Sequence, residues 1–394
     1  MSMSEWQKYK LGEVYSFSSG LSKSSDQFGY GFDFLTFKDV FNNYFLPDKL
    51  TALVNSTEKE RQTCSIKRGD VFLTRTSETD DELGMSSVAL KDYPNATFNG
   101  FTKRLRPLGN VEIYPEFVAY YFRSPRFRAN IVGMSSITTR ASLNNSMLAE
   151  LPLLLPNYEE QVRIATILKS LDDKIGLLHR ENTTLEAMAE TLFRQWFIEE
   201  ANGDDISLGE VVKTTSGGTP SRKKEEYYCN GNVKWVKSKE LHHSYILETE
   251  EKITEDAVAY SSAKLLPENS VLIAMYGATV GEYGILAEPM TCNQAVCALI
   301  PNENYPYTYL YLWAKYMQGE FINLACGAAQ QNISQELIKQ QYVSNDLKQI
   351  SDFHILVAPY MEKMKVNQEM IKTLNQMRDG LLPKLMNREV LVYG

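Results

Sequence analysis

The stretch from Asn157 to Ile198 constrains the fold of this chain more than any other. It contains no proline and only one glycine, Gly176. Mostly apolar side chains recur along it in alternating steps of three and four residues, which is the spacing of the a and d positions of a coiled coil. These positions are Leu168, Leu171, Ile175, Leu178, Asn182, Leu185, Ala189, Leu192 and Trp196. The pattern predicts a helix of roughly 60 Å, at about 1.5 Å per residue, that is capped by Asn157 and needs a partner helix.

The partner is predicted near the other end of the chain, where the same spacing returns at a constant offset. The corresponding positions are Val357, Tyr360, Met364, Asn367, Ile371, Leu374, Arg378, Leu381 and Leu385. Because a whole domain separates the two helices, we expect an intramolecular, antiparallel pair whose register is fixed by Asn182. We expect Pro359 in the first turn or at a kink, and Pro383 at a kink or at the end. Two amphipathic helices of an ordinary bundle remain an alternative.

The region between the helices repeats the region before them. Leu11–Val14 returns as Leu208–Val211, and each copy is followed by a Ser-Gly pair. Further matched segments are Phe34–Val40 with Trp235–Leu241 and Val71–Leu73 with Val271–Ile273, which are both predicted to be strands, and Leu143–Asn144 with Ile333–Ser334. The sequence therefore predicts an α+β protein with two repeated domains, residues 1–156 and 204–345, each followed by a long helix, residues 157–200 and 346–394. The two domains share short motifs but differ at most positions between them, which is typical of domains that recognise different targets. A duplication followed by functionally neutral divergence is an alternative.

Composition limits the function classes. The 394 residues are 43% apolar and 23% charged, and their formal net charge is −8. This acidic balance argues against tight nonspecific DNA binding by the chain alone, so a nucleic-acid function needs local basic patches or a partner that supplies charge. We expect no membrane association and a cytoplasmic location, because the sequence shows neither a long apolar run nor a hydrophobic signal core. The five cysteines lack a CxxC spacing, as in reduced thiols.

No active site is legible in the sequence. There is no Pro-Pro pair, which excludes the Asn/Asp-Pro-Pro-aromatic loop of amino-methyltransferases, and no Gly-Lys pair, which excludes a phosphate-binding loop. Gly277, Gly281 and Gly284 do not have the spacing of a dinucleotide fingerprint. Asp80, Asp81 and Glu82 favour a solvated loop over a metal site. We therefore predict no catalytic residues, no metal site and no cofactor bound by this chain.

Motifs along the chain resemble one family, the specificity (S) subunits of type I restriction–modification enzymes. The segment from Gln161 through Leu168 and Asp172 to Phe193 resembles the family's first conserved region, and Arg378–Leu385 resembles its second. Marks similar to those of its target-recognition domains are Gly218–Ser221, Gly277–Gly281, Asn293–Gln294 and Gly327–Ser334. The first domain departs from these marks, with Gly20–Lys23 and Asn99–Gly100 at the matching places, and the second helix opens differently, at Gln349–Phe353.

This resemblance implies a non-catalytic subunit that reads an asymmetric, bipartite double-stranded DNA target. Residues 1–156 and 204–345 would be the target-recognition domains, and the two helices would be conserved spacers that relate them by a pseudo-twofold axis. Two methyltransferase subunits, which would bind S-adenosylmethionine, and restriction subunits would be the partners. The spacer helices would act as a ruler between the half-sites. The alternatives are a coiled-coil scaffold without a DNA role, or a stand-alone methyltransferase or nuclease with unrecognised motifs.

Candidate DNA contacts are polar and basic side chains at loop ends, because these groups reach phosphates and base edges. In the first domain they are Lys38, Arg75, Thr76, Ser77, Lys103, Arg104, Thr138, Thr139 and Arg140. In the second they are Thr219, Ser221, Arg222, Lys223, Lys237, Lys239, Tyr276, Asn293, Gln294, Gln330 and Gln331. The alternative for each is solvated surface or turn chemistry. Candidates for docking the methyltransferase subunits, on outward helix faces, are Asp172, Asp173, Lys174, Arg194 and Arg378, with ordinary helix-surface charge as the alternative.

Overall fold

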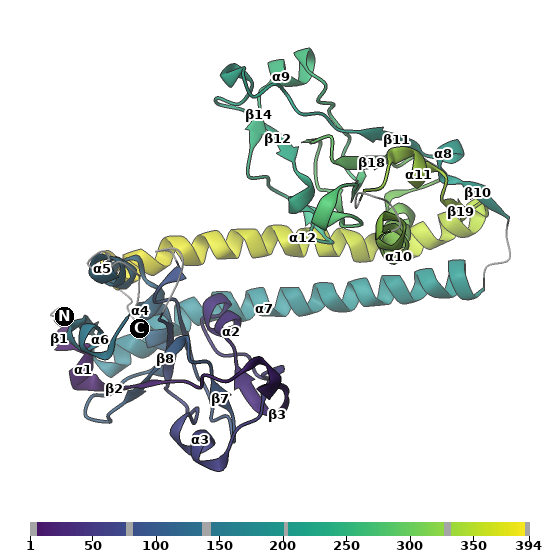
Figure 1. Ribbon diagram of the computed structural model, residues 1–394. Helices are drawn as coiled ribbons and strands as arrows, with labels where there is room; N and C mark the ends of the chain where they lie inside the picture. Colours follow the sequence, from purple (N-terminus) through teal and green to yellow (C-terminus); the bar gives the residue numbers. More distant parts are fainter. Residues whose placement is uncertain (1–5, 76–81, 136–142, 201–203, 327–331, 391–394) are drawn as a thin grey trace. The chain divides into compact units, whose positions relative to one another are not determined.

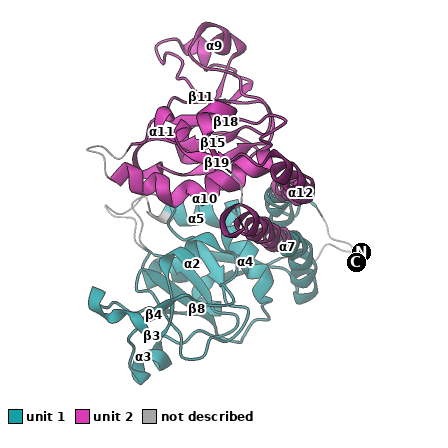
Figure 2. Cartoon of the chain, turned by 90° about the vertical axis from the view of Figure 1, so that its right-hand side faces the viewer, with its two compact units in different colours: residues 1–174, 374–394 teal, residues 175–373 magenta. Residues whose placement is uncertain are grey.

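A computed structural model describes residues 6–75, 82–135, 143–200, 204–326 and 332–390. The chain divides into two compact units, the first formed by Met1–Lys174 with Leu374–Gly394 and the second by Ile175–Thr373 (Figure 2). Each unit contains one globular repeat and a part of each of two long helices. We call residues 7–155 repeat 1 and residues 205–344 repeat 2. Within the described ranges, no helix is both long and apolar enough to cross a membrane.

The long helices are α7, Tyr158–Arg194, and α12, Leu347–Met386 (Figure 1). Asn157 caps α7 as predicted, since its Oδ1 accepts a hydrogen bond from the backbone N–H of Glu160 at 2.9 Å. Asp346 caps α12 in the same way, with the N–H of Gln349 at 2.9 Å. Because this cap starts α12 at Leu347, Pro359 lies well inside the helix, so the first of its two expected places, the first turn, is wrong. A π-helical turn, Gln195–Glu199, follows α7.

Within each unit the two helices run antiparallel, as predicted. In unit 1, Leu168 shares an apolar cluster with Leu382 and Leu385 near the end of α12. In unit 2, the ring of Trp196 lies 5.9 Å from that of Phe353 near the start of α12. Every predicted interhelix position is buried or half-buried. The fold is thus the predicted one, with two α+β repeats and a pair of long antiparallel helices.

Polar side chains also join the helices. In unit 2, the Nδ2 of the fully buried Asn367 donates to the Oδ1 of Asn182 at 2.8 Å, a contact of the kind that fixes register in coiled coils. In unit 1, Arg378 and Asp172 form an ion pair at 2.7 Å in which both side chains are largely buried. These two residues were expected on outward faces for docking a partner, and that expectation is wrong. Their charges attract each other across the helix pair, and the hydroxyl of Tyr120 donates to Asp172 at 2.6 Å.

The two repeats have the same sheet topology. The main antiparallel sheet has the order β2-β8-β5-β6 in repeat 1 and β11-β18-β15-β16 in repeat 2, where β13 adds a parallel edge strand. A smaller sheet has the order β4-β3-β7 in repeat 1 and β14-β12-β17 in repeat 2. A two-stranded sheet pairs β1 with β9 in repeat 1 and β10 with β19 in repeat 2. Apart from β13, the strands agree one for one, which confirms the internal repeat that the sequence predicts.

The elements have the following bounds. Those of repeat 1 are β1 Gln7–Lys10, α1 Leu11–Val14, β2 Tyr15–Ser19, β3 Phe28–Leu35, α2 Phe37–Asn42, β4 Ala52–Val54, α3 Glu58–Thr63, β5 Val71–Thr74, β6 Ser86–Val88, β7 Thr97–Phe98, β8 Thr102–Pro107, α4 Pro115–Arg123, α5 Pro125–Ser135, α6 Asn145–Glu150 and β9 Pro152–Leu155. Those of repeat 2 are β10 Asp205–Ser207, α8 Leu208–Val211, β11 Lys213–Ser216, β12 Val233–Val236, β13 Tyr245–Ile246, β14 Lys252–Ile253, α9 Glu255–Tyr260, β15 Val271–Ala274, β16 Tyr283–Leu286, β17 Thr291–Cys292, β18 Val296–Ile300, α10 Tyr307–Cys326, α11 Gln335–Lys339 and β19 Tyr342–Ser344.

One predicted element is only half a strand. The segment Phe34–Val40 is extended only as far as Leu35, where β3 ends. Thr36 and Asp39 then form a capping box that starts α2, because each side chain accepts the other's backbone N–H, at 2.9 Å and 3.2 Å. The matching segment in repeat 2 behaves alike, since β12 ends at Val236 and a 3₁₀ turn follows.

The main sheet of each repeat lies between two apolar cores, because successive strand residues face opposite sides. In repeat 1, Val71 and Leu73 belong to the core shared with α4 and the long helices, whereas Phe72 belongs to a core shared with Phe98 of the smaller sheet. The sheet is therefore anchored to the helix pair on one side and supports the smaller sheet on the other.

Candidate nucleic-acid interface

Three loops meet at the end of the central strand of each repeat. In repeat 1, Arg75 follows β5, and its backbone N–H donates to the carbonyl of Phe101 at 3.0 Å. The N–H of Leu143 in turn donates to the carbonyl of Arg75 at 3.0 Å. We call Arg75, Phe101 and Leu143 the three-loop junction of repeat 1.

Repeat 2 has the same junction, formed by Met275, Ala295 and Ile333. The N–H of Met275 donates to the carbonyl of Ala295 at 2.8 Å, and the N–H of Ile333 to that of Met275 at 2.9 Å. The backbone frame is thus shared, whereas two of the three side chains differ in kind: Arg75 and Phe101 in repeat 1 against Met275 and Ala295 in repeat 2. A shared frame with exchanged side chains suits two sites that recognise different things.

The glycine of each repeated Ser-Gly pair allows another loop to reach this region. A Cβ built on Gly217 would lie 2.2 Å from the carbonyl oxygen of Cys292, and one on Gly20 would lie 2.2 Å from that of Phe98. No larger residue fits at either place, because the backbone passes directly against the end of β17 or β7. The loop that follows Gly217 is therefore held beside the turn that contains Asn293 and Gln294.

In repeat 2 the structure brings several predicted contacts together. Thr219 and Gln294 are joined by a hydrogen bond between their side chains. Asn293 shapes the turn, since its Oδ1 accepts the N–H of Ala295 at 3.2 Å. Tyr276, which follows Met275 of the junction, is 43% exposed. These residues form one polar surface around the junction, as expected of groups that read base edges.

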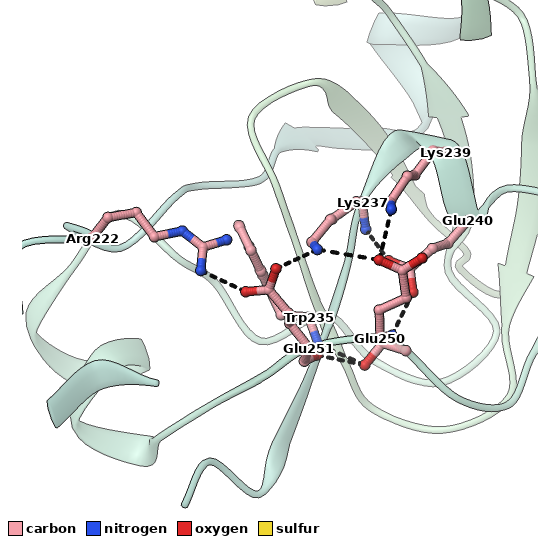
Figure 3. Close-up of polar contacts among 8 residues, drawn as sticks. Arg222, Trp235, Lys237, Lys239, Glu240, Glu250 and Glu251 are labelled. Carbon is pink, nitrogen blue, oxygen red and sulfur yellow. Dashed lines mark hydrogen bonds and ion pairs between the residues drawn. The ribbon is translucent and has the colours of Figure 1, made fainter. Parts of the chain in front are cut away.

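Predicted basic residues of repeat 2 form an ion-pair cluster with two glutamates (Figure 3). Arg222 Nη1 lies 2.6 Å from Glu251, and Lys237 is also paired with this carboxylate. Lys239 Nζ lies 2.7 Å from Glu250. The hydrogen bond from Arg222, and then that from Lys237, lowers the pKa of Glu251 to about 2. The cluster thus contains three cations, each of which is paired with an acid of the chain itself.

Aromatic rings hold Arg222 in place. Its guanidinium lies 4.3 Å from the ring centroid of Tyr228 and 5.2 Å from that of Trp235. Trp235 is buried, and its Nε1–H donates to the carbonyl of Gly218 at 3.0 Å. A guanidinium stacked on a fixed ring keeps its planar donors oriented, which suits recognition of a phosphate or of guanine. Ser221 and Lys223, in the same loop, are exposed.

Two predicted contacts of repeat 1 turn inward. Lys103 is buried, and its Nζ donates to Ser19 Oγ at 2.8 Å and to Asn145 Oδ1 at 2.9 Å. Arg104 is also buried, and its Nη1 donates to the carbonyl of Ser65 at 2.6 Å. These cations satisfy carbonyl and amide groups of the fold. We therefore place them behind the interface rather than on it. Lys38 is exposed on α2.

Arg75 is less buried than these two residues. It is half-buried, and its Nε, like that of Arg104, lacks a hydrogen-bond partner among the described residues. Burial, and then the charge of Arg75, lowers the pKa of Lys103, which indicates that two cations lie near each other here. A buried donor without a partner at a cationic place suits an anionic or acceptor-rich ligand.

The other predicted contacts lie outside the described residues. They are Thr76, Ser77, Thr138, Thr139, Arg140, Gln330 and Gln331. The same is true of Asp80 and Asp81. Among the described residues, no three His, Cys, Asp or Glu side chains gather to hold a metal ion.

Sequence reasoning missed three features of the site: the exposed ring of Phe101, the aromatic support of Arg222, and the two glutamates of the cluster. The Asn99–Gly100 pair before Phe101 was a visible signal, because Asn-Gly is typical of tight turns between strands. The pairing of Arg222 with Glu251 joins segments far apart in the chain and has no local signal.

Comparisons with known proteins agree with this architecture. The profile of a family described as "Type I restriction modification DNA specificity domain" matches residues 3–187 and 202–345. The MjaIX specificity subunit of Methanocaldococcus jannaschii, a type I restriction enzyme component, is 27% identical over 97% of this chain and 92% of its own. The HindI specificity subunit of Haemophilus influenzae is 24% identical over 98% of this chain and 100% of its own.

A solved structure has the same fold. The S subunit of a type I restriction–modification system from M. genitalium aligns with a TM-score of 0.63 and 16% identity, over 98% of this chain and 97% of that one. The family profile covers both repeats and part of α7, which is most of the chain. The chain therefore belongs to the type I restriction–modification DNA specificity family.

Proposed function

We propose that this chain is the DNA-specificity subunit of a type I restriction–modification complex and that each repeat reads one half of an asymmetric, bipartite target. The single observation that carries the proposal is the duplicated three-loop junction. Its backbone hydrogen bonds are the same in both repeats, whereas Arg75 and Phe101 of one are replaced by Met275 and Ala295 of the other. Two equal frames with unequal side chains are suited to two half-sites of different sequence.

The charge of the chain supports a complex in which the partner subunits supply most of the nonspecific affinity for DNA. The net charge is −8, and each cation of the ion-pair cluster is paired with Glu250 or Glu251. Phosphate contacts supply most nonspecific affinity for DNA, and this surface offers few unbalanced cations for them. We infer that tight binding requires methyltransferase subunits, which supply charge and enclose the duplex. The chain itself would contribute base recognition and no catalytic group.

The helix pair offers a docking surface for such a subunit. In unit 2, an apolar groove of about 630 Å³ lies along α7 and α12. Met188 and Leu356, both in its lining, are 45% and 39% exposed. Exposed apolar surface on a helix pair is typical of a protein–protein interface. We take this groove as a contact for a methyltransferase subunit, which would bind S-adenosylmethionine. Restriction subunits would join that core, and the complex would act in the cytoplasm, where host DNA lies.

The lengths of the helices support the ruler. α7 has 37 residues and α12 has 40. At about 1.5 Å per residue these are roughly 55 Å and 60 Å, so the pair is long enough to span the distance of about 34 Å between successive major-groove faces on one side of DNA. Insertion of equal, heptad-compatible segments in both helices should lengthen the gap between half-sites. An unchanged gap in the methylated sites would contradict the ruler.

DNA binding by the assembled complex tests the proposal. The chain is assembled with its methyltransferase subunits and titrated against a library of duplexes at several salt concentrations. We expect selection of one bipartite sequence, with affinity that falls as salt rises. The isolated chain is the control and should bind far more weakly. Assembly without any sequence selection would contradict the proposal and favour a scaffold, while methylation or cleavage by the isolated chain would favour an enzyme.

A further inference from the structure

Phe101 is an exposed aromatic residue on a turn that is built to hold it. The ring is 60% exposed, at the loop between β7 and β8. The Oδ1 of Asn99 accepts the N–H of Phe101 at 2.7 Å, and the hydroxyl of Thr102 donates to the carbonyl of Asn99 at 2.7 Å. At Gly100, a Cβ would lie 2.5 Å from Ser22 Oγ. This turn is fixed from several sides, so the ring has a defined place at the surface.

The fold does not need an aromatic ring at this position. Ala295 occupies it in repeat 2 and makes the same backbone bond to the residue after the central strand. An alanine at this place is therefore compatible with the turn and with the junction. A phenylalanine that a fixed turn holds in water, at a place where the fold accepts alanine, is available for a contact with something outside the chain.

Arg75, which is hydrogen-bonded to Phe101 through the backbone, indicates what kind of molecule makes that contact. The carbonyl of Phe101 accepts the N–H of Arg75, whose Nε is buried without a partner among the described residues. The site thus combines an unused cationic donor with an apolar ring. DNA offers this combination in its grooves, where acceptors for arginine lie close to the thymine methyl group and to base faces. A phenylalanine ring donates no hydrogen bond, so a phosphate is not its partner.

We propose that Phe101 is a specificity-determining residue of repeat 1, which packs against the apolar surface of one base in the half-site that this repeat reads. Arg75 contributes an adjacent hydrogen bond to a base edge or phosphate. The proposal rests on the function proposed above and assigns it a residue. It also predicts that the half-site of repeat 2 lacks this apolar contact.

The test measures the binding of the complete methyltransferase complex to modified targets. Each nucleotide of the bipartite site is replaced in turn by an abasic residue, and each thymine by uracil, which lacks the 5-methyl group. We expect that the wild type loses about tenfold in affinity at one position in one half-site. Phe101→Ala should bind the intact site about tenfold more weakly and be indifferent to that position. Sensitivity to uracil assigns the contact to the methyl group, and sensitivity to the abasic residue alone assigns it to a base face.

Two further variants make the result decisive. Ala295→Phe, at the matching position of repeat 2, is the control. It should alter the response to substitutions in the other half-site only. Phe101→Leu keeps an apolar side chain and should recover part of the lost affinity. The dependence of affinity on salt should be unchanged in Phe101→Ala, because no phosphate contact is removed. A loss that is equal at both half-sites, or an unchanged position profile, would overturn the proposal. A wild type without any preferred sequence would overturn the proposed function instead.

Discussion

Repeat 1 and repeat 2 build the same sheet from opposite chemistry. In β8, which crosses the middle of the main sheet, repeat 1 has Lys103, Arg104, Leu105 and Arg106. The strand register gives Cys297, Ala298, Leu299 and Ile300 as their counterparts in β18 of repeat 2. Three cations thus occupy places that the other repeat fills with small or apolar side chains.

The cations of repeat 1 hold the repeat together. Arg106 meets the fully buried Asp70 with two hydrogen bonds, from Nε at 2.7 Å and from Nη2 at 2.6 Å. In repeat 2, by contrast, Arg222, Lys237 and Lys239 form a cluster with Glu250 and Glu251 in which every side chain is at least partly exposed. The comparison shows that a basic residue near the end of a strand is not by itself a DNA contact. Its role depends on which acceptors the fold brings to it.

The largest expected effect concerns Arg106. Arg106→Met leaves the carboxylate of Asp70 buried without its cation, so we expect the free energy of unfolding of repeat 1 to fall by about 3–5 kcal/mol. Ile300→Met, at the counterpart in repeat 2, is the control and should cost less than about 1.5 kcal/mol. Hydrogen exchange of β5 and β15 reports each repeat separately. Equal losses for the two variants would break the comparison.

A second effect compares the two parts of the helix pair. Unit 1 joins the helices by the Asp172–Arg378 ion pair, whereas in unit 2 the amide of Asn367 donates to Asn182 and to the carboxylate of Glu181. Asn367→Leu leaves the amide of Asn182 facing an apolar side chain, and we expect a loss of about 1–3 kcal/mol. Combination with Asn182→Leu should recover most of it, because no amide is then left facing an apolar side chain. Chemical denaturation of the wild type, the two single variants and the double variant gives the coupling free energy between Asn182 and Asn367. Losses that simply add would contradict the contact.

A third effect concerns the acids of the ion-pair cluster. Glu251→Gln removes the carboxylate that pairs with Arg222 and Lys237. We expect stronger nonspecific DNA binding by the complex and a salt dependence steeper by about one to two phosphate contacts. Glu336→Gln is the control with the same change in net charge, on an exposed ion pair with Lys339. If both variants change binding equally, net charge rather than the cluster would be responsible.

The smallest effect is the pH dependence of stability. The pKa of Glu251 is lowered from 4.5 to about 2, first by its hydrogen bond with Arg222. The stabilisation from this group is therefore fully present above pH 4.5 and is lost as the pH falls through about 2. In repeat 1, a hydrogen bond with Lys23 lowers the pKa of Glu60 to about 2 as well. Glu251→Gln should reduce the loss of stability at acid pH in repeat 2 only, and Glu60→Gln should do so in repeat 1 only. Hydrogen exchange during an acid titration measures both effects.

Periodicity and self-similarity predicted the architecture. The heptad positions and the repeated Leu-Gly-Glu-Val segments were sufficient for the helix pair and the duplicated α+β repeats, and the family came from the resemblance of the motifs. These signals are local or repeat along the chain, so one sequence contains them in full. The half-strand at Phe34–Val40 was also predictable, because the capping pair Thr36 and Asp39 is visible in the sequence.

The site was less predictable, because its roles depend on contacts between distant residues. Nothing near Arg104 in the sequence indicates that it would bind the carbonyl of Ser65, and nothing near Arg378 points to Asp172. α12 also buries Ile350, Phe353 and Met361, which lie outside the predicted seam, because this face packs on repeat 2. The heptad spacing predicts only the face of α12 that contacts α7. The second buried face, which packs on repeat 2, does not follow from that spacing.

The central claim is that one chain holds two readers of different sequence, and methylation mapping tests it most directly. DNA from the host with the intact gene is sequenced for modified bases and compared with DNA from a strain that carries Phe101→Ala. We predict a bipartite motif with two unlike halves and a gap of fixed length, in which the variant relaxes one position of one half. A single continuous motif, two identical halves, or relaxation of both halves together would contradict the account.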